Sequence, residues 1–347
     1  MTPSWGSVLG TLLVAAALLA ACVFLVTPQR LARADVGYLL EDARDDFAFI
    51  SWRAFQIVEA GPQPAAVALL GASSMLHGIT SDADVARVIA QRADRRVPVY
   101  DLTAGGLSPW EAAGLMYRIG ANFNGVIVLG IGAELLATPP TELEGLRRHP
   151  RLAFRTSAFD EELKIAGMEP LPATGNYFID NSQFFTARIG AIGRLVTGPI
   201  RHSRHTDWRK SLDARTWRFQ VDRVSQWIRD GYPAHARANL EVLGRLIARA
   251  RARGDVRVAL LVTPINPRAL AEFDPGVDAR FMADARAFAA ATGAELWRLD
   301  DEAALREDEF DDWCHLGNND GRVRYTRALA ERIAGLGDFS QAPEDSS

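Results

Sequence analysis

Five short apolar runs, separated by longer amphipathic stretches, constrain the fold of this 347-residue chain more than any other feature of its sequence. The runs cover residues 66–71, 97–104, 125–133, 256–265 and 294–299. Each is continuously apolar rather than alternating, which is typical of strands buried on both faces of a parallel sheet. Because parallel strands need long crossover connections, the pattern predicts an α/β fold with an open, mostly parallel five-stranded sheet and helices on both faces.

Helices are predicted between and after these strands, at residues 81–93, 108–120, 234–254, 278–293 and about 320–335. Ser81 and Ser108 are suitable N-caps, and Glu111 completes a capping box with Ser108. Gly254 and Gly293 are suited to end helices, because glycine readily adopts the left-handed conformation found there. These local signals favour the same alternating fold.

The domain organisation follows from where the alternation stops. The predicted parts are a membrane anchor at 1–27, a helical linker at 28–65, a main α/β domain at 66–335 and a disordered tail at 336–347. Within the linker, one helix is predicted over about 34–60. Residues 134–233 are rich in arginine, aromatic residues, proline and glycine. We interpret them as a large insertion, partly helical around 207–230.

Composition narrows the possible functions. Apolar residues make up 48% of the chain and charged residues 24%, which is typical of a globular protein. The net charge is only −4, so bulk charge gives no indication of a nucleic-acid partner. The two cysteines, Cys22 and Cys314, are too few for a disulfide framework.

The N-terminal segment predicts a membrane helix. From Gly6 to Val26 the chain has 21 residues without a charge, enough for a helix to cross a bilayer. The alternatives are a cleaved signal peptide and a lipoprotein signal, the latter suggested by "LAAC" at residues 19–22. Both fit less well, because no basic residue precedes the run and the apolar sequence continues past the cysteine. We interpret the segment as a single retained anchor.

The orientation of this anchor is ambiguous from the flanking charges. Arg30 and Arg33 follow the apolar run, and no lysine or arginine precedes it. The positive-inside rule would then place the main domain in the cytoplasm. Two charges are a weak bias, and the family resemblance described below favours the opposite side.

Candidate catalytic residues follow the predicted strands, where ligands bind in open parallel sheets. Ser73 comes directly after the first strand, behind Gly71. It is either the N-cap of the next helix or a nucleophile with an exposed hydroxyl. After the second strand, the backbone N–H groups of Gly105 and Gly106 can approach a ligand closely, as an oxyanion hole requires. The alternative is a plain loop.

A histidine and an acid precede the last helix. His315 follows Asp312 by three residues in "DDWCHLGNND". A serine nucleophile needs a base, and the base needs an acid to orient it, so the two residues would complete a triad with Ser73. A surface turn is the alternative interpretation of this common spacing.

The combination of these features resembles the SGNH (GDSL-like) hydrolase family. A strand-end Gly-x-Ser, a glycine loop after the second strand and Asp-x-x-His before the last helix match that family's order over about residues 66–335, with the insertion unmatched. The resemblance implies a flavodoxin-like SGNH fold. It assigns the nucleophile to Ser73, the base to His315 and the orienting acid to Asp312. It leaves open whether Gly105 or Gly106 completes the oxyanion hole; we favour Gly106.

One family feature is missing. Hydrolases of the family place an asparagine after the third strand as an oxyanion donor, and here Gly132 in "GIGAE" takes that position. Losing one such donor typically lowers the rate by ~10²–10³-fold. Asn266, which follows the fourth strand on the same edge, is a candidate replacement.

The resemblance is strongest to the membrane-anchored branch that includes the teichoic acid D-alanyl transfer and alginate O-acetylation proteins. It implies a single-pass protein with an extracytoplasmic, periplasmic domain that transfers or removes acyl groups on a cell-envelope polysaccharide. A membrane-bound O-acyltransferase is the implied partner, and no cofactor, metal or nucleic acid is implied. The alternatives are a simple esterase or thioesterase, and a non-catalytic protein that binds a glycan or an acyltransferase.

Overall fold

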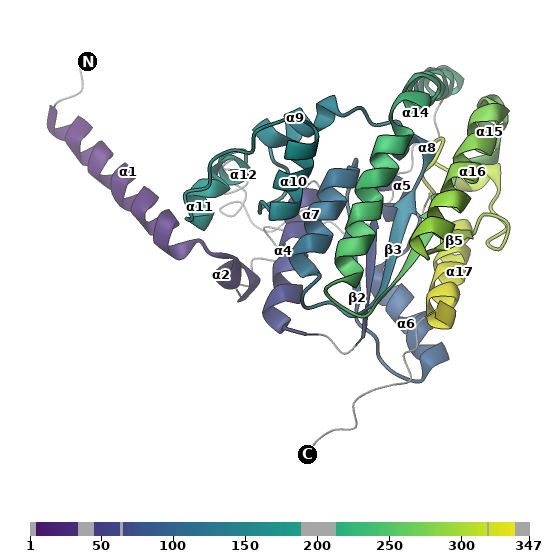
Figure 1. Ribbon diagram of the computed structural model, residues 1–347, viewed down its shortest axis with the longest axis horizontal. Helices are drawn as coiled ribbons and strands as arrows, with labels where there is room; N and C mark the ends of the chain where they lie inside the picture. Colours follow the sequence, from purple (N-terminus) through teal and green to yellow (C-terminus); the bar gives the residue numbers. More distant parts are fainter. Residues whose placement is uncertain (1–4, 34–44, 63–64, 189–212, 318, 337–347) are drawn as a thin grey trace.

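The computed structural model describes residues 5–33, 45–62, 65–188, 213–317 and 319–336. Its centre is a single sheet of five parallel strands in the order β2-β1-β3-β4-β5 (Figure 1). The strands are β1 (Ala66–Gly71), β2 (Val99–Thr103), β3 (Gly125–Ile131), β4 (Val256–Val262) and β5 (Glu295–Arg298). The prediction of an α/β fold with an open parallel sheet is confirmed, because every predicted apolar run contains one of these strands.

Helices cover both faces of the sheet (Figure 1). On one face α6 (Asp82–Ala93) and α17 (Asp320–Leu336) pack against each other. On the other face lie α4 (Asp46–Ala60), α7 (Pro109–Ile119), α14 (Ala214–Arg251) and α16 (Pro275–Thr292). Successive strand residues contribute to opposite cores, as Ile127 and Val128 show. Burial on both faces is why the strands are apolar throughout.

The predicted N-cap hydrogen bonds are present at two helices. The side chain of Ser81 accepts a hydrogen bond from the N–H of Asp84 and begins α6. Ser108 and Glu111 form the predicted capping box at α7. Gly293 ends α16 with φ +62°, whereas α14 ends at Arg251, before the predicted stop.

The described part of the predicted insertion is largely helical. Up to residue 188, five short helices follow β3: α8 (Ala133–Leu136), α9 (Thr141–Arg148), α10 (Ser157–Ile165), α11 (Tyr177–Asp180) and α12 (Ser182–Thr186). The predicted start of a helix at 234 is wrong, because α14 (Ala214–Arg251) runs without a break through Pro233, where the insertion was predicted to end. Burial of Ile228 and Tyr232 just before the proline stabilises the helix across it.

The helix before the sheet begins later than predicted in the part of the chain that the structure describes. The helix α4 begins at Asp46, and the side chain of Asp45 accepts a hydrogen bond from the N–H of Ala48 as its N-cap. The prediction of one helix over 34–60 is therefore wrong at Asp45, and its residues 34–44 lie outside the described part. The predicted disordered tail also lies outside it, except for Leu336, which ends α17.

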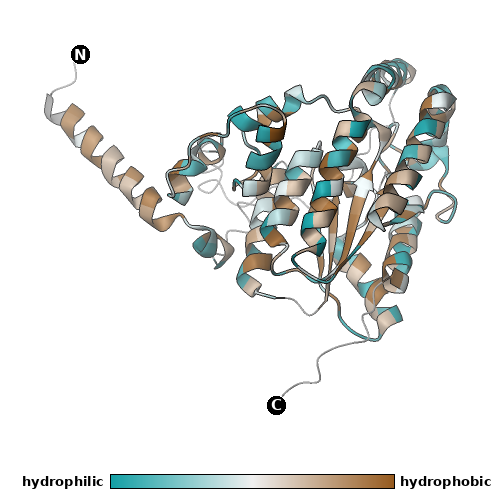
Figure 2. Ribbon diagram, in the orientation of Figure 1, coloured by the Kyte–Doolittle hydropathy of each residue, from teal (hydrophilic) through white to brown (hydrophobic). Residues whose placement is uncertain are grey.

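The N-terminal helix α1 (Trp5–Leu25) extends away from the α/β domain (Figure 1) and is almost uniformly apolar (Figure 2). Its stretch Val8–Leu25 is long and apolar enough to cross a membrane, and none of that stretch is buried against the rest of the chain. At its end, the carbonyl of Val23 accepts a hydrogen bond from the side chain of Asn176, 3.2 Å away. The short helix α2 (Pro28–Arg33) follows and packs against α4.

The turn after β1 depends on close packing between a glycine and a methionine. Ser73–Leu76 form the short helix α5, and the fully buried Met75 lies over the end of the strand. A Cβ atom at Gly71 would lie 2.7 Å from Sδ and 2.9 Å from Cβ of Met75. Because Cβ of Met75 belongs to the rigid start of its side chain, a larger residue at position 71 must displace α5.

We expect Gly71→Ala to lower the free energy of unfolding by about 1–3 kcal/mol, the usual cost of overpacking a core. Gly145→Ala is the matched control, because Gly145 is exposed on α9 and nothing lies near its Cβ position. That control is expected to be neutral or stabilising by up to about 1 kcal/mol. Urea unfolding of both variants measures the difference. Equal free energies of unfolding for the two variants would contradict the close packing of Met75 on Gly71.

Candidate active site

The sheet brings the ends of β1 and β3 together although their sequences are far apart. Leu70 pairs with Leu129, so Ser73 and Gly132, each three residues further on, lie at the same edge of the sheet. The chain runs from β1 outward to β2 and then returns to β3 on the other side. Such a reversal of strand order opens a crevice at the carboxyl ends of the strands.

The structure brings the three predicted triad side chains into one hydrogen-bonded chain. The Ser73 hydroxyl lies 2.9 Å from Nε2 of His315, and Nδ1 of His315 lies 2.6 Å from Oδ2 of Asp312. The ring of His77 packs edge-to-face on that of His315, with centroids 4.9 Å apart. The Asp312 and His315 side chains are only 18% and 25% exposed, so neighbouring groups restrict their positions.

Ser73 is not a helix cap. The N-cap of α5 is Ala72, and Ser73 is the first residue of the helix, with its hydroxyl directed to His315. The capping interpretation is therefore wrong. The neighbouring Ser74 hydroxyl is buried and has no hydrogen-bond partner within the described residues, so the structure separates the roles of the two serines.

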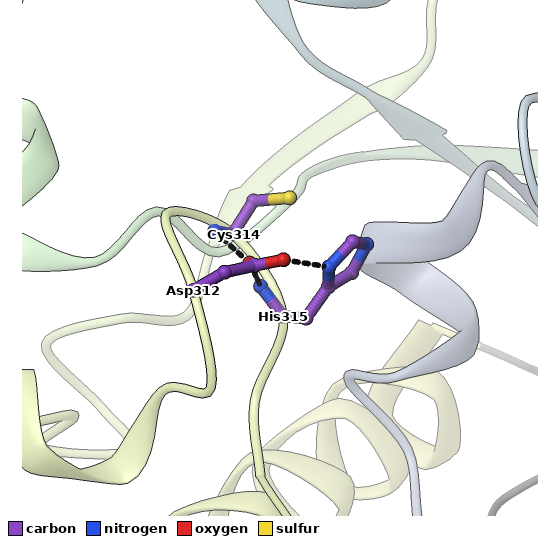
Figure 3. A group of neighbouring side chains, drawn as sticks. All are labelled: Asp312, Cys314 and His315. Carbon is purple, nitrogen blue, oxygen red and sulfur yellow. Dashed lines mark hydrogen bonds and ion pairs between the residues drawn. The ribbon is translucent and has the colours of Figure 1, made fainter. Parts of the chain in front are cut away.

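The Asp312 carboxylate is held in its ionised form. Burial by itself raises the pKa of Asp312, but hydrogen bonds from the His315 ring and from the N–H groups of Cys314 and His315 outweigh it and leave the pKa below its ordinary value (Figure 3). An ionised Asp312 accepts a hydrogen bond from the N–H at Nδ1 of His315. Nε2 then has a free lone pair for the Ser73 proton, which is the tautomer that a general base requires.

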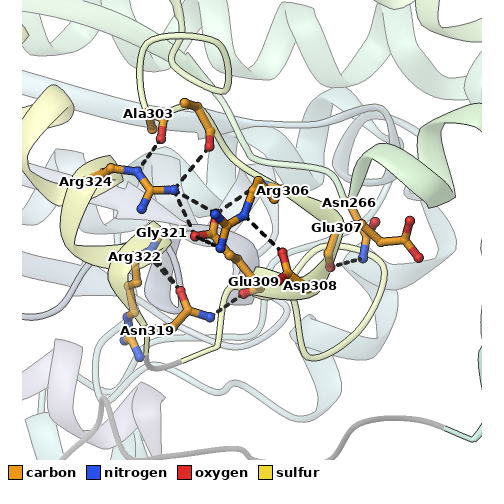
Figure 4. A network of polar contacts seen from close by, with 11 residues as sticks. Asn266, Ala303, Arg306, Glu307, Asp308, Glu309, Asn319, Gly321, Arg322 and Arg324 are labelled. Atoms are coloured by element: carbon orange, nitrogen blue, oxygen red, sulfur yellow. Dashed lines mark hydrogen bonds and ion pairs between the residues drawn. The ribbon is translucent and has the colours of Figure 1, made fainter.

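A network of polar contacts anchors the loop that carries Asp312 and His315 (Figure 4). The buried carboxylate of Glu309 accepts two hydrogen bonds from Arg324, each 2.9 Å long. The amide of Asn319 donates to the carbonyl of Glu309, 2.8 Å away. Within the loop, the N–H of Asp311 donates to the carbonyl of His315. The triad's base and acid are thus fixed to α17 and not carried on a free surface turn.

The side chain of Asn266, the predicted oxyanion donor, is engaged in other contacts. It is 2% exposed and begins α15 (Pro267–Glu272), where its side-chain oxygen accepts from the N–H of Arg268. Its amide group lies 3.3 Å from the carbonyl of Glu307 (Figure 4) and 3.3 Å from that of Asp312. These contacts take up the donors of the amide beneath the Asp312–His315 loop, so the structure gives no support to an oxyanion role for Asn266.

The two candidate glycines differ in whether their backbone N–H already has an acceptor. The N–H of Gly105 donates to Oδ2 of Asp46, 2.9 Å away, so it is already used. Gly106 lines the cavity beside Ser73, and its φ of +71° is a conformation that favours glycine. Its carbonyl accepts from Arg151, 3.0 Å away, and within the described chain nothing accepts from its N–H. Of the two, Gly106 has the free donor.

Ser73 opens into a cleft of about 520 Å³, a size typical of small-molecule binding sites. Apolar, aromatic and charged residues share its lining: Ala72, Ser73, Gly106, Leu107, Glu134, Leu135, Glu142, Arg151, Arg223, Trp227, Trp313 and Cys314 are among them. A second cavity of about 280 Å³ lies between α7 and α9–α12, and its lining includes no histidine or cysteine. Of these two cavities, the cleft at Ser73 is the one with a serine hydrogen-bonded to a histidine.

Glu134 is among the residues of this cleft that the sequence did not predict. It lies two positions after Gly132, and a Cβ atom placed on Gly132 would collide with its carboxylate. The carboxylate of Glu134 thus fills the space that a side chain at position 132 would occupy. The only sequence signal was an acid in "GIGAE", directly after a strand end.

Asp312, Cys314 and His315 also place three potential metal ligands within 4.8 Å of one another (Figure 3). Both ring nitrogens of His315 already face Asp312 and Ser73. Burial raises the pKa of the Cys314 thiol well above its ordinary value, and nearby Asp312 and Glu134 raise it further. A protonated thiol is a poor ligand, so this donor set is better suited to proton transfer than to metal binding.

Comparison with protein-family models finds no match to this chain, and comparison with curated proteins finds none either. The chemistry that the chain supports is therefore inferred from the geometry around Ser73. There, a serine, a histidine and an aspartate are hydrogen-bonded in line beside the backbone N–H of Gly106 and open into a cleft.

Replacing Asn266 tests whether it supports the loop or binds substrate. We expect Asn266→Ala to lower the free energy of unfolding by about 1–3 kcal/mol, because it leaves the carbonyls of Glu307 and Asp312 without their donor. Asn266→Asp is the matched variant, since it keeps the cap oxygen and removes the donor. Thermal unfolding and labelling of Ser73 by a fluorophosphonate measure both effects. Full stability with slower labelling would instead support an oxyanion role.

Proposed function

We propose that this chain is a serine acyl-transfer enzyme in which Ser73 forms an acyl-enzyme with His315 as general base and Asp312 as its orienting acid. The observation that supports this most directly is the continuous hydrogen-bonded chain from Ser73 through His315 to Asp312 at the mouth of a cleft. Each member has the partner that its role requires. No cofactor enters the proposal.

In the first half-reaction, the Ser73 oxygen attacks the acyl carbon as its proton moves to Nε2 of His315. The carbonyl π-bond becomes an oxyanion, which the N–H groups of Ser73 and Gly106 stabilise. Collapse of this intermediate breaks the bond to the leaving oxygen, which takes the proton from His315. Ionised Asp312 stabilises the imidazolium that exists between these two steps.

In the second half-reaction, a hydroxyl group attacks the acyl-enzyme. It loses its proton to Nε2 of His315 as its oxygen bonds to the acyl carbon. Ser73 leaves with that same proton, which restores the starting state. A sugar hydroxyl gives acyl transfer and water gives hydrolysis, so the acceptor decides the reaction.

We further propose the flavodoxin-like SGNH fold and a cell-envelope polysaccharide as the substrate. The strand order β2-β1-β3-β4-β5 and the family order of the strand-end motifs support the fold. Trp227 and Trp313 line the cleft and offer flat apolar surfaces suited to sugar rings. The apolar helix α1 supports anchoring in a membrane, where a membrane-bound O-acyltransferase is the proposed partner.

Chemical labelling tests the nucleophile. We expect a fluorophosphonate to label the full-length protein at Ser73, and Ser73→Ala to abolish the labelling. Asp312→Asn is expected to slow it by ~10²–10⁴-fold, because the His315 tautomer is no longer held. Mass spectrometry of the labelled peptide and time courses measure both effects. Labelling of a folded Ser73→Ala variant at the wild-type rate would refute the assignment.

Acceptor choice is tested in cells. We expect loss of Ser73 to change the acyl content of envelope glycans, measured after mild alkaline release. Incubating the purified full-length protein with short acyl esters measures the reaction in which water, and not a glycan, is the acyl acceptor. Fast turnover that no glycan accelerates would instead indicate a simple esterase.

The location of the catalytic domain is tested with reporter fusions. We propose the extracytoplasmic side and expect a fusion after residue 60 to be active only with a reporter that works outside the cytoplasm. Activity of a cytoplasm-specific reporter at the same position would contradict this location.

A further inference from the structure

Within the described chain, Glu134 is the one carboxylate that lines the cleft from the end of β3. It belongs to the short helix α8, and its main-chain carbonyl accepts a hydrogen bond from the indole of Trp227, 3.3 Å away. This contact ties its backbone to α14. The carboxylate itself lies back over Gly132, in the space where a side chain at that position would project.

The carboxylate of Glu134 is buried and only partly satisfied. Its own backbone N–H donates to it, whereas Oε2 is inaccessible to solvent and has no partner among the described residues. A buried, unpaired oxygen of an ionised carboxylate would be costly. Protonation removes most of that cost and turns the group into a donor that needs an acceptor.

The groups that face Glu134 do not neutralise it. His315 and Cys314 approach from the loop before α17, and Arg151, Arg223 and Glu142 line the same cleft. The structure records no ion pair between Glu134 and either arginine within the described residues. Burial raises the pKa of Glu134, against the opposing influence of its own N–H and of His315.

We propose that Glu134, in its protonated form, donates a third hydrogen bond to the oxyanion that Ser73 and Gly106 hold, taking the place of a donor on residue 132. The inference rests on the acyl transfer proposed above. The proton stays on Glu134 throughout: it moves closer to the oxygen as negative charge develops and relaxes when the intermediate collapses. A neutral acid in an apolar site has this capacity because it donates a strong hydrogen bond without adding charge.

A pH dependence follows from this role. The rate falls at high pH when Glu134 ionises, because the carboxylate loses its donor and repels the developing oxyanion. Glutamine at position 134 keeps a donor and cannot ionise, so it should remove only the fall at high pH.

The experiment measures Ser73 acylation by p-nitrophenyl acetate in the full-length protein, held in detergent micelles, across the pH range. We expect Glu134→Ala to lower the rate by ~10²–10³-fold, as for other oxyanion donors. Glu134→Gln should stay within about tenfold of the wild type and lack the high-pH fall. Glu241→Gln, an exposed glutamate on α14, is the control and should match the wild type.

A rescue variant separates the donor role from a structural one. In Glu134→Ala the space beside Gly132 is empty, and the extended backbone there accepts any residue. Gly132→Asn combined with Glu134→Ala should therefore regain at least tenfold of the lost rate, because the asparagine amide supplies the missing hydrogen bond. Thermal unfolding of each variant shows that the differences arise in folded protein.

Three results would overturn the inference while acyl transfer itself stands: a wild-type rate in Glu134→Ala, a glutamine variant as slow as the alanine variant, or a high-pH fall that persists in Glu134→Gln. Failure of the underlying function has a different signature. There, Ser73→Ala would react with the ester as fast as the wild type, whatever residue occupies position 134.

Discussion

Parallel pairing of β1 with both of its neighbours is the constraint on which the rest of this structure depends. Because β1 lies between β2 and β3, the residues that follow all three strands lie at one edge of the sheet. Ser73, Gly106 and Glu134 follow these three strands, and the loop before α17 places His315 against Ser73 from the other side. A slip of one residue in either pairing would turn the strand's side chains to the opposite face and separate these groups.

Apolar packing supports the turn that carries Ser73, and polar contacts support the loop that carries Asp312 and His315. Met75 fits over Gly71 only because that position has no side chain, and this contact sets the height of Ser73 above the sheet. Glu309 and Asn266 instead hold the loop that presents Asp312 and His315. Ser73 therefore lies on an apolar support, whereas His315 and Asp312 lie on a hydrogen-bonded one. This arrangement fits a site in which only the substrate and protons need to move.

The sequence predicted secondary structure well where residues close together in the chain determine it. Continuous apolar runs located all five strands, since burial on both faces leaves little room for polar residues. Ser81 and Ser108 marked helix starts because their side chains satisfy N–H groups only a few residues away. Prediction failed at Pro233, where local chemistry argues for a helix break but burial of Ile228 and Tyr232 keeps α14 intact.

The sequence by itself determined the strands, their apolar character, the uncharged N-terminal helix and the residue types available for a triad, because these depend on local composition and spacing. Only the tertiary structure decided which of those residues meet. It joined Ser73 to His315 across 242 positions, chose Gly106 over Gly105 through the contact with Asp46, and engaged Asn266 beneath a loop. It also placed Glu134 in the space beside Gly132. Such distinctions depend on which donors and acceptors are already satisfied, and that is settled only when distant segments pack together.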